Sequence, residues 1–337
     1  KARMDGILVL LKPPGMTSHD VVNVVRRQLG ERRVGHTGTL DPGAAGILVV
    51  CIGNATRLIP YMEDHIKVYR AELWFGKSTD TQDAGGEVVE EKREFSFTDE
   101  ELLRALDAFR GEIEQIPPMV SALKHQGQRL YQLARQGKTI ERKPRRVKIL
   151  RLTPVGHWRR GEWRYGDSFI FDVTCSKGTY IRTLCQDLGH YLQIPSHMSF
   201  LIRTGVGPWS LQDSLTLEEL IDATWDKSDV KTEASTLPNL PGLLPMDRGL
   251  GHLPGAVLSG KASTRLCHGG SVPVQEVETW LEPVDVDVTA SIEKDPTKKS
   301  LLRVYDGQGR FLGISRTSRD KAGEVLQPVR LLPSASK

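Results

Sequence analysis

The stretch Val34-Gly-His-Thr-Gly-Thr-Leu-Asp-Pro-Gly-Ala-Ala-Gly46 combines a glycine-rich turn with a single carboxylate. Glycines tolerate backbone angles and close approaches that a Cβ would block. Pro42 fixes its own φ and favours an extended conformation at Asp41. The apolar run at 47–52 predicts a buried strand directly after the turn, and loops of this kind commonly carry catalytic groups. We therefore expect a rigid loop that presents Asp41; the simpler alternative is an Asp-Pro-Gly turn in which Asp41 bonds its own backbone.

The segments on either side of this loop predict a mixture of strands and helices. Strands are expected where apolar residues run together or alternate with polar ones, at 6–11, 47–52, 68–75, 147–152, 169–175, 302–305 and 311–314. Helices are expected where a polar cap precedes apolar residues at helical spacing, at 17–30, 98–111, 128–137, 181–188 and from 216. Because these elements do not follow strict βαβ order, we predict an α+β fold with a mixed, largely antiparallel sheet flanked by helices.

Length and composition predict a soluble protein with one large or two ordinary domains. The chain has 337 residues, of which 39% are apolar and 26% charged, so it can bury a sizeable core. Polar residues with Pro and Gly dominate from about Ala223 to Leu244, which we interpret as a linker or a surface excursion. The four cysteines are far apart and lack zinc-ligand spacing, which favours a reducing, cytoplasmic compartment. No apolar run approaches the ~20 residues that span a bilayer, so we expect no membrane contact.

A strongly basic segment occupies the middle of the chain. Between positions 124 and 151 Glu141 is the only acid. The bases are Lys124, Arg129, Arg135, Lys138, Arg142, Lys143, Arg145, Arg146, Lys148 and Arg151. Such a block suits a polyanionic partner, and a solvated basic loop is the alternative.

Five ordered blocks resemble the motifs of the TruB family of pseudouridine synthases. The Gly-His-Thr-Gly-Thr-Leu-Asp-Pro sequence is similar to the catalytic motif of that family. The other four blocks are Lys12-Pro-Pro-Gly-Met-Thr-Ser18, Lys67-Val-Tyr-Arg-Ala71, Gly178-Thr-Tyr-Ile-Arg-Thr183 and Arg203-Thr-Gly-Val-Gly207. The resemblance implies a pseudouridine synthase domain over residues 1–245, with an RNA-gripping basic insertion at about 117–148. It also implies a small C-terminal β-barrel of the PUA type, an RNA-binding module, over residues 246–337.

The resemblance implies that Asp41, Tyr69 and Arg182 carry the reaction. Pseudouridine formation breaks the N1–C1′ bond and joins C5 to C1′, so it needs an ionised carboxylate beside a flipped base; we expect neither cofactor nor metal. Arg182 would pair with Asp41 and keep it anionic, whereas its spacing alone favours a surface cation. Tyr69 would stack on the uracil while its hydroxyl helps to remove the C5 proton. Its position on the apolar face of a strand also fits a core tyrosine.

A second group of residues is expected to contact or support the RNA. By resemblance, His36 would fill the space that the flipped nucleotide leaves, Leu201 would shape the pocket wall, and Lys12 would support the catalytic loop. Asp83 would join the charge network around Arg182. The full set expected at the substrate is His36, Lys12, Tyr180, Leu201, Lys124, Arg129, Arg142, Arg145 and Arg146.

Three functions follow from these observations. The first is a stand-alone tRNA pseudouridine synthase that acts on uridine 55 of the T loop, as a monomer that needs no protein partner. The second is a guide-RNA-dependent synthase of the dyskerin type, which requires partner proteins. The basic stretch at 121–131 favours the first, because it looks like the insertion with which stand-alone enzymes grip the T arm. The third is a non-catalytic RNA-binding or tRNA-folding protein, against which the presence of all three expected catalytic residues argues.

Overall fold

The computed structural model describes residues 4–119, 121, 124–125, 128–129, 140–225, 240–284, 301–321 and 323–333. The helices are α1 (Ser18–Leu29), α2 (Ile59–Met62), α3 (Asp99–Ala108), α5 (Ile181–Tyr191), α6 (Leu217–Trp225) and α7 (Gly260–Cys267), with 3-10 turns η1 (Gly53–Leu58), η2 (Leu211–Asp213), η3 (Met246–Leu250) and η4 (Val274–Glu276). The strands of the larger unit are β1 (Gly6–Lys12), β2 (Val34–His36), β3 (Ala45–Ile52), β4 (Lys67–Phe75), β5 (Lys77–Thr79), β6 (Val88–Glu91), β7 (Phe97–Thr98), β8 (Gly111–Gln115), β9 (Lys124–His125), β10 (Gln128–Arg129), β11 (Arg145–Pro154), β12 (Glu162–Trp163), β13 (Ser168–Cys175), β14 (Ser196–Val206) and β15 (Trp209–Ser210). The C-terminal strands are β16 (Gly255–Leu258), β17 (Val272–Pro273), β18 (Val277–Leu281), β19 (Leu301–Asp306), β20 (Phe311–Asp320) and β21 (Gly323–Leu331).

One large sheet organises the first two thirds of the described chain. Its strand order is β1-β3-β14-β4-β13-β11-β8, with β2 paired to β3 and β15 paired to β14. Within these described strands, β14 and β3 form the parallel pair and the other neighbours run antiparallel. The predicted mixed, largely antiparallel sheet is confirmed. Strand β14 stands where the two halves of the sheet meet, between the motif strands β3 and β4.

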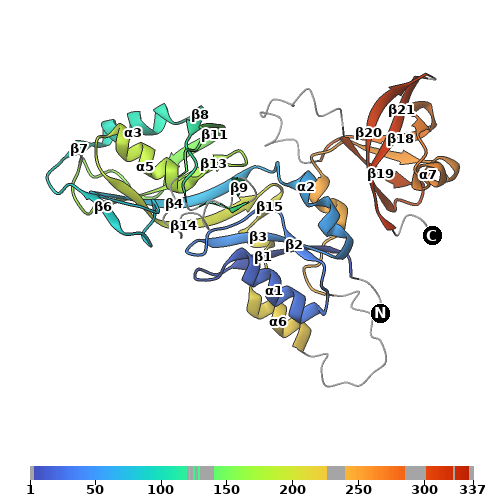
Figure 1. Cartoon of the computed structure of the whole chain (residues 1–337), viewed down its shortest axis with the longest axis horizontal. Helices are drawn as coiled ribbons and strands as arrows, with labels where there is room; N and C mark the ends of the chain where they lie inside the picture. The colour runs from blue at the N-terminus through green and yellow to red at the C-terminus, as the bar shows by residue number, and fades with distance from the viewer. Residues whose placement is uncertain are drawn as a thin grey trace.

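Helices α1 and α6 lie side by side on one face of the β1–β3 half (Figure 1). Thr17 caps α1 through a reciprocal capping box with Asp20, and Gly30 ends the helix at φ +61°. The predicted start and end of this helix are therefore confirmed. Val21, Val22 and Val25 are at most 1% exposed beneath it, and burying each such side chain contributes about 1.5–3 kcal/mol.

Helices α3 and α5 cover the other half of the sheet (Figure 1). Thr98 and Glu101 form the predicted capping box of α3. On β4, alternate residues are buried in the core cluster beneath these helices, namely Tyr69, Ala71, Leu73 and Phe75. The predicted alternation of β4 is confirmed, and it places Tyr69 on the same face of the sheet as α5.

The C-terminal unit is a second, curled sheet in the order β17-β21-β20-β19-β16-β18, with α7 packed against it. The predicted hairpin is present: β19 and β20 pair antiparallel across the turn that Asp306 closes. Asp306 accepts hydrogen bonds from the backbone N–H groups of Gln308 and Arg310. This arrangement is a curled half-barrel, in keeping with the small β-barrel expected at this end.

The two units share a hydrophobic cluster. Ile314 and Leu332 of the C-terminal unit belong to the same buried cluster as Val9, Val49 and Trp209 of the larger unit. The segment expected to be a linker also contributes, which corrects that prediction. Leu240 is 4% exposed in the cluster beneath α1, and Leu244 exchanges backbone hydrogen bonds with Ile7 at the sheet edge. Residues 226–239 lie outside the described part, and the division at 245/246 stays a prediction.

The basic segment connects two adjacent strands of the large sheet. β8 ends at Gln115, and its antiparallel partner β11 begins at Arg145, so Arg145 and Arg146 belong to the sheet itself. The helix predicted over 128–137 is wrong at its start, because Gln128 and Arg129 form β10, which pairs with β9. The remainder of that predicted helix lies outside the described residues.

Candidate active site

The loop that carries Asp41 is a turn closed by its backbone. It joins β2 to β3, and the Ala44 N–H donates to the Asp41 carbonyl across 3.1 Å. Gly46 follows at φ +119°, and a Cβ there would lie 2.2 Å from the Arg203 carbonyl oxygen. Only glycine therefore fits where β3 crosses closely against β14. The loop is anchored at the point where the two halves of the sheet join.

Asp41 and Arg182 form a two-pronged ion pair. Arg182 Nε donates to Asp41 Oδ2 across 2.9 Å, and Nη2 donates to Oδ1 across 3.3 Å. The guanidinium is 3% exposed whereas the Asp41 side chain is 38% exposed, so the carboxylate is accessible in front of a buried cation. These contacts join the Asp41 carboxylate to Arg182 and not to the backbone of its own loop, which was the simpler alternative. Arg182 is the second residue of α5, where the helix dipole disfavours a cation and favours a nearby anion.

A short loop holds the far side of Arg182. Arg182 Nη1 donates to the Thr81 carbonyl across 3.0 Å, and Asp83 Oδ2 lies 3.9 Å from Nε. Asp83 is itself fixed by the Thr81 hydroxyl and the Gly85 N–H. Asp83 thus joins the charge network at a longer distance than Asp41, as the sequence led us to expect.

Tyr69 lies against the apolar wall behind Asp41. It is 9% exposed and belongs to the same buried cluster as Leu40, Ala44 and Leu201. Burial raises the pKa of the Tyr69 hydroxyl, while the charge of Arg203 acts in the opposite direction. The structure thus brings Tyr69 and Leu201 together on the α5 side of the sheet. A ring in this position closes the apolar side of a site whose polar side is Asp41 and Arg182.

Three buried polar side chains hold the loop from behind, and sequence reasoning had singled out only the first. Lys12 is fully buried, and its ammonium donates to the carbonyls of Pro13, Met16 and Pro42. Burial lowers the pKa of Lys12 to about 8, although the Asp41 charge raises it. Since its three N–H groups all reach carbonyls, Lys12 supports the loop and presents no donor to a substrate.

Ser18 and Arg203 are the supports that the sequence did not single out. The Ser18 hydroxyl donates to the Leu40 carbonyl across 3.0 Å and accepts from the Leu40 N–H across 2.9 Å. Arg203 is 2% exposed and donates from Nε to the Ile47 carbonyl across 2.8 Å and from Nη2 to the Gly38 carbonyl across 3.1 Å. Both residues stand within matched motifs, which is the signal that could have found them. Their acceptors are main-chain carbonyl groups distant in sequence, and a sequence pattern cannot reveal such a contact.

The other residues expected to contact the RNA differ in how far they are buried. His36 is half-buried at the end of β2, opposite Val50. Tyr180 directly precedes α5, and its backbone is fixed by Gln115; burial raises the pKa of its hydroxyl. Arg142 is half-buried and donates to the Pro117 carbonyl across 2.9 Å.

The other bases lie at the start of β11 and in the β9–β10 pair. Arg145 and Arg146 are exposed at the start of β11, and Arg146 lies 3.7 Å from Glu114 on the neighbouring strand. The backbones of Lys124 and Arg129 oppose each other in the β9–β10 pair, and their side chains lie outside the described atoms. The predicted RNA contacts of all these residues stay predictions.

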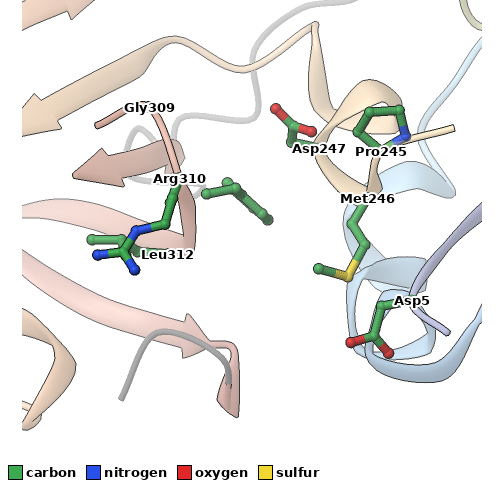
Figure 2. Close-up of a pocket in the computed structure, with 8 residues that line it drawn as sticks. Asp5, Pro245, Met246, Asp247, Gly309, Arg310 and Leu312 are labelled. Atoms are coloured by element: carbon green, nitrogen blue, oxygen red, sulfur yellow. The ribbon is translucent and has the colours of Figure 1, made fainter. Parts of the chain in front are cut away.

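A separate cavity of about 430 Å³ opens between the two units (Figure 2). It is lined by Asp5, Pro245, Met246, Asp247, Gly309, Arg310, Phe311 and Leu312. None of these residues belongs to the Asp41 site. Among the described residues, no three His, Cys, Asp or Glu side chains are grouped so that they could hold a metal ion. Within those same ranges, every helix is too short or too polar to cross a membrane.

Comparisons with known proteins identify the family. Residues 26–181 match the family described as "TruB family pseudouridylate synthase (N terminal domain)", and residues 182–251 match "tRNA pseudouridylate synthase B C-terminal domain". A Symbiobacterium thermophilum protein named tRNA pseudouridine synthase B is 49% identical over 270 residues, which are 80% of this chain and 83% of the relative. A protein of the same name from Alkaliphilus oremlandii is 42% identical over 319 residues, covering 94% of this chain and 100% of the relative.

A solved structure shares the fold of the whole described chain. A chain in the "Crystal Structure of a Cbf5-Nop10-Gar1 Complex" superposes with a TM-score of 0.69 at 23% identity, covering 97% of this chain and 84% of that one. This likeness confirms the fold, including the C-terminal unit. The family descriptions and the two relatives go further, and by them the chain belongs to the TruB family of pseudouridine synthases.

Proposed function

We propose that this protein isomerises uridine 55 in the T loop of tRNA to pseudouridine, as a stand-alone enzyme. The observation that carries the proposal is the paired carboxylate: Asp41 is 38% exposed and held by a buried Arg182 beside an apolar wall. Relatives named tRNA pseudouridine synthase B, at 39–49% identity, support tRNA as the substrate.

Asp41 is the anionic group that acts on the flipped nucleotide. Two hydrogen bonds from Arg182 hold the carboxylate and fix its direction. Because the guanidinium is buried, it stays fixed behind the more exposed carboxylate. Tyr69 and Leu201 provide the apolar surface on which the uracil rests, and stacking on an aromatic ring compensates part of the unstacking energy. The isomerisation neither gains nor loses atoms or electrons, so the proposed reaction requires no cofactor.

The rest of the RNA contacts come from outside the site. The bases at 142–151 and the C-terminal unit, taken as residues 246–337, provide the grip on the T arm. His36 and Tyr180 border the catalytic residues and contact the nucleotides next to the flipped base. We place the enzyme in the cytoplasm and propose that it acts as a monomer without an obligatory protein partner.

Two other functions give different outcomes in the same test. A guide-dependent synthase is the alternative that the fold neighbour suggests, since its title names a complex with Nop10 and Gar1. A non-catalytic tRNA-binding protein is the other.

The test is tritium release from a tRNA transcript labelled with 5-³H-uridine, using the purified chain alone. The proposal requires release of one equivalent of tritium per transcript, abolished when cytidine replaces uridine 55. No release without added protein and guide RNA would favour the guide-dependent enzyme. Tight tRNA binding without any release would favour the non-catalytic protein.

A further inference from the structure

Among the described residues, none forms an ion pair with the buried guanidinium of Arg203. It is 2% exposed, and its three hydrogen bonds reach the carbonyls of Ile47, Gly38 and Thr39 at 2.8, 3.1 and 3.4 Å. A carbonyl orients a guanidinium but does not neutralise it, and burial of a charge is expensive. A smaller polar side chain could tie the loop at lower cost, as Ser18 does at Leu40. The charge itself therefore needs an explanation.

The place of Arg203 in the sheet supplies that explanation. Arg203 on β14 is the direct cross-strand partner of Tyr69 on β4, so the two side chains project from the same face at neighbouring positions. A guanidinium has five N–H groups, and three of them are used by the loop carbonyls. Burial is the largest influence on the Tyr69 hydroxyl and raises its pKa, while the charge and hydrogen bonding of Arg203 act to lower it.

The other titratable groups around Tyr69 do not replace this cation. Cys175 on β13 and Asp41 in the loop both act to raise the pKa of the hydroxyl. Lys67, two residues before Tyr69 on β4, is a second buried cation, but its ammonium donates to the Glu63 carbonyl across 2.7 Å. Burial lowers the pKa of Lys67 to about 8, and Arg203 contributes to that lowering. Arg203 is thus the permanent charge at this point.

We propose that Arg203 is a positioning residue that spans the Asp41 loop and Tyr69, and that its charge lowers the free energy needed to form the Tyr69 phenolate that accepts the C5 proton. This inference rests on the proposed function. The phenol first loses its proton to bulk water. After C5 has joined C1′, the phenolate oxygen takes the C5 proton, the C5–H electron pair forms the C5=C6 bond, the C6=N1 pair moves to N1, and N1 takes a proton from water. No oxidant, reductant or further reactant enters the step.

The first test reads the Tyr69 hydroxyl in the protein without RNA. The more acidic 3,5-difluorotyrosine is placed at position 69, and its ¹⁹F titration is followed in the wild type, Arg203→Lys and Arg203→Met. We expect the titration midpoint to rise in Arg203→Met and to stay near the wild-type value in Arg203→Lys. The matched control is Arg303→Met, which removes a similarly buried arginine whose Nε donates to the Leu253 carbonyl in the other unit. An unchanged midpoint in Arg203→Met would overturn the inference, whether or not the enzyme acts on tRNA.

The second test is the pH dependence of single-turnover tritium release at saturating enzyme. Loss of proton-transfer assistance costs about 10²–10⁴-fold, so Arg203→Met should be at least about 10²-fold slower at pH 7.5. Its rate should also recover as the pH rises, since the phenolate then forms without the cation. A slow variant with the wild-type pH profile would mean that Arg203 only holds the loop, and that result would refute its action on Tyr69. Absence of tritium release by the wild type would instead refute the proposed function.

Discussion

Replacing Asp41 by Asn separates catalysis from stability. The change keeps the size of the side chain and one acceptor oxygen, but it removes the charge that Arg182 binds at 2.9 and 3.3 Å. One amide hydrogen then faces the guanidinium. Arg182 then keeps the Thr81 carbonyl as a hydrogen-bond acceptor and Asp83 as a nearby anion, so the buried cation still has partners.

The two effects differ in size. Hydrogen bonds to charged groups contribute about 1.5–3 kcal/mol and neutral ones about 0.5–1.5. Because the Asp41 side chain is 38% exposed, water already weakens this pair, and we expect the free energy of unfolding to fall by about 1–2 kcal/mol. A protein stable by about 5–15 kcal/mol stays folded after such a decrease. Removal of the reacting anion should instead slow turnover at least about 10³-fold, which raises the barrier by about 4 kcal/mol.

The assay compares single-turnover tritium release, tRNA affinity by filter binding and thermal unfolding. The matched control is Asp172→Asn, because Asp172 also forms a two-pronged pair, with Arg70 at 2.8 and 2.9 Å, but on exposed side chains of β13 and β4. That variant should lose less than about 1 kcal/mol of stability and keep its rate. Retention of a tenth of the wild-type rate by Asp41→Asn would remove Asp41 from the reaction. Equal decreases in rate and in affinity would make it a binding residue.

Changes at Tyr69, in the basic segment and at Lys12 should each have a distinct effect. Tyr69→Phe should bind tRNA normally yet react at least about 10²-fold more slowly, and a wild-type rate would reduce Tyr69 to a stacking or core residue. Neutralising four bases of the central segment should flatten the slope of log affinity against log salt by about 0.7–0.9 for each RNA phosphate that they bind in the wild type, and an unchanged slope would mean that the RNA is held elsewhere. The four are Arg142, Lys143, Arg145 and Arg146. Lys12 has a pKa of about 8 in the folded protein and 10.5 as a free side chain, so between these values the unfolded state binds the proton and the folded state does not. The free energy of unfolding should therefore increase with pH in that window, by at most about 3 kcal/mol. Urea unfolding of Lys12→Met should show a smaller increase. An increase identical to that of the wild type would exclude Lys12 as its source.

Patterns in the sequence predicted those structural features that depend on residues close together in the chain. The Thr17 and Thr98 caps, the Gly30 end of α1 and the alternation of β4 each depend on residues a few positions apart. The pairing of Asp41 with Arg182 spans 141 residues, and it could be anticipated only because both stand in matched motifs.

What could not be predicted depends on main-chain acceptors and on distant packing. Arg203 binds the carbonyl of Ile47, 156 residues away, and a carbonyl leaves no trace in a sequence. The polar composition before Leu244 hid two leucines that complete the cores of the larger unit. The helical spacing after residue 128 was misleading, because Gln128 and Arg129 form strand β10, which pairs with β9.

The hydrophobic cluster that joins the two units has a thermodynamic consequence. Ile314 and Leu332 are at most 1% exposed, and they belong to one hydrophobic cluster with residues of β1 and β3. Melting the C-terminal sheet would therefore remove part of the cover of this shared cluster, at about 25 cal/mol for each Å² of apolar surface exposed. Neither unit can lose its structure at no cost to the other, so the chain should unfold in one cooperative calorimetric transition. A substitution at Leu332, near the end of the described chain, would then lower the melting temperature of the unit that holds Asp41.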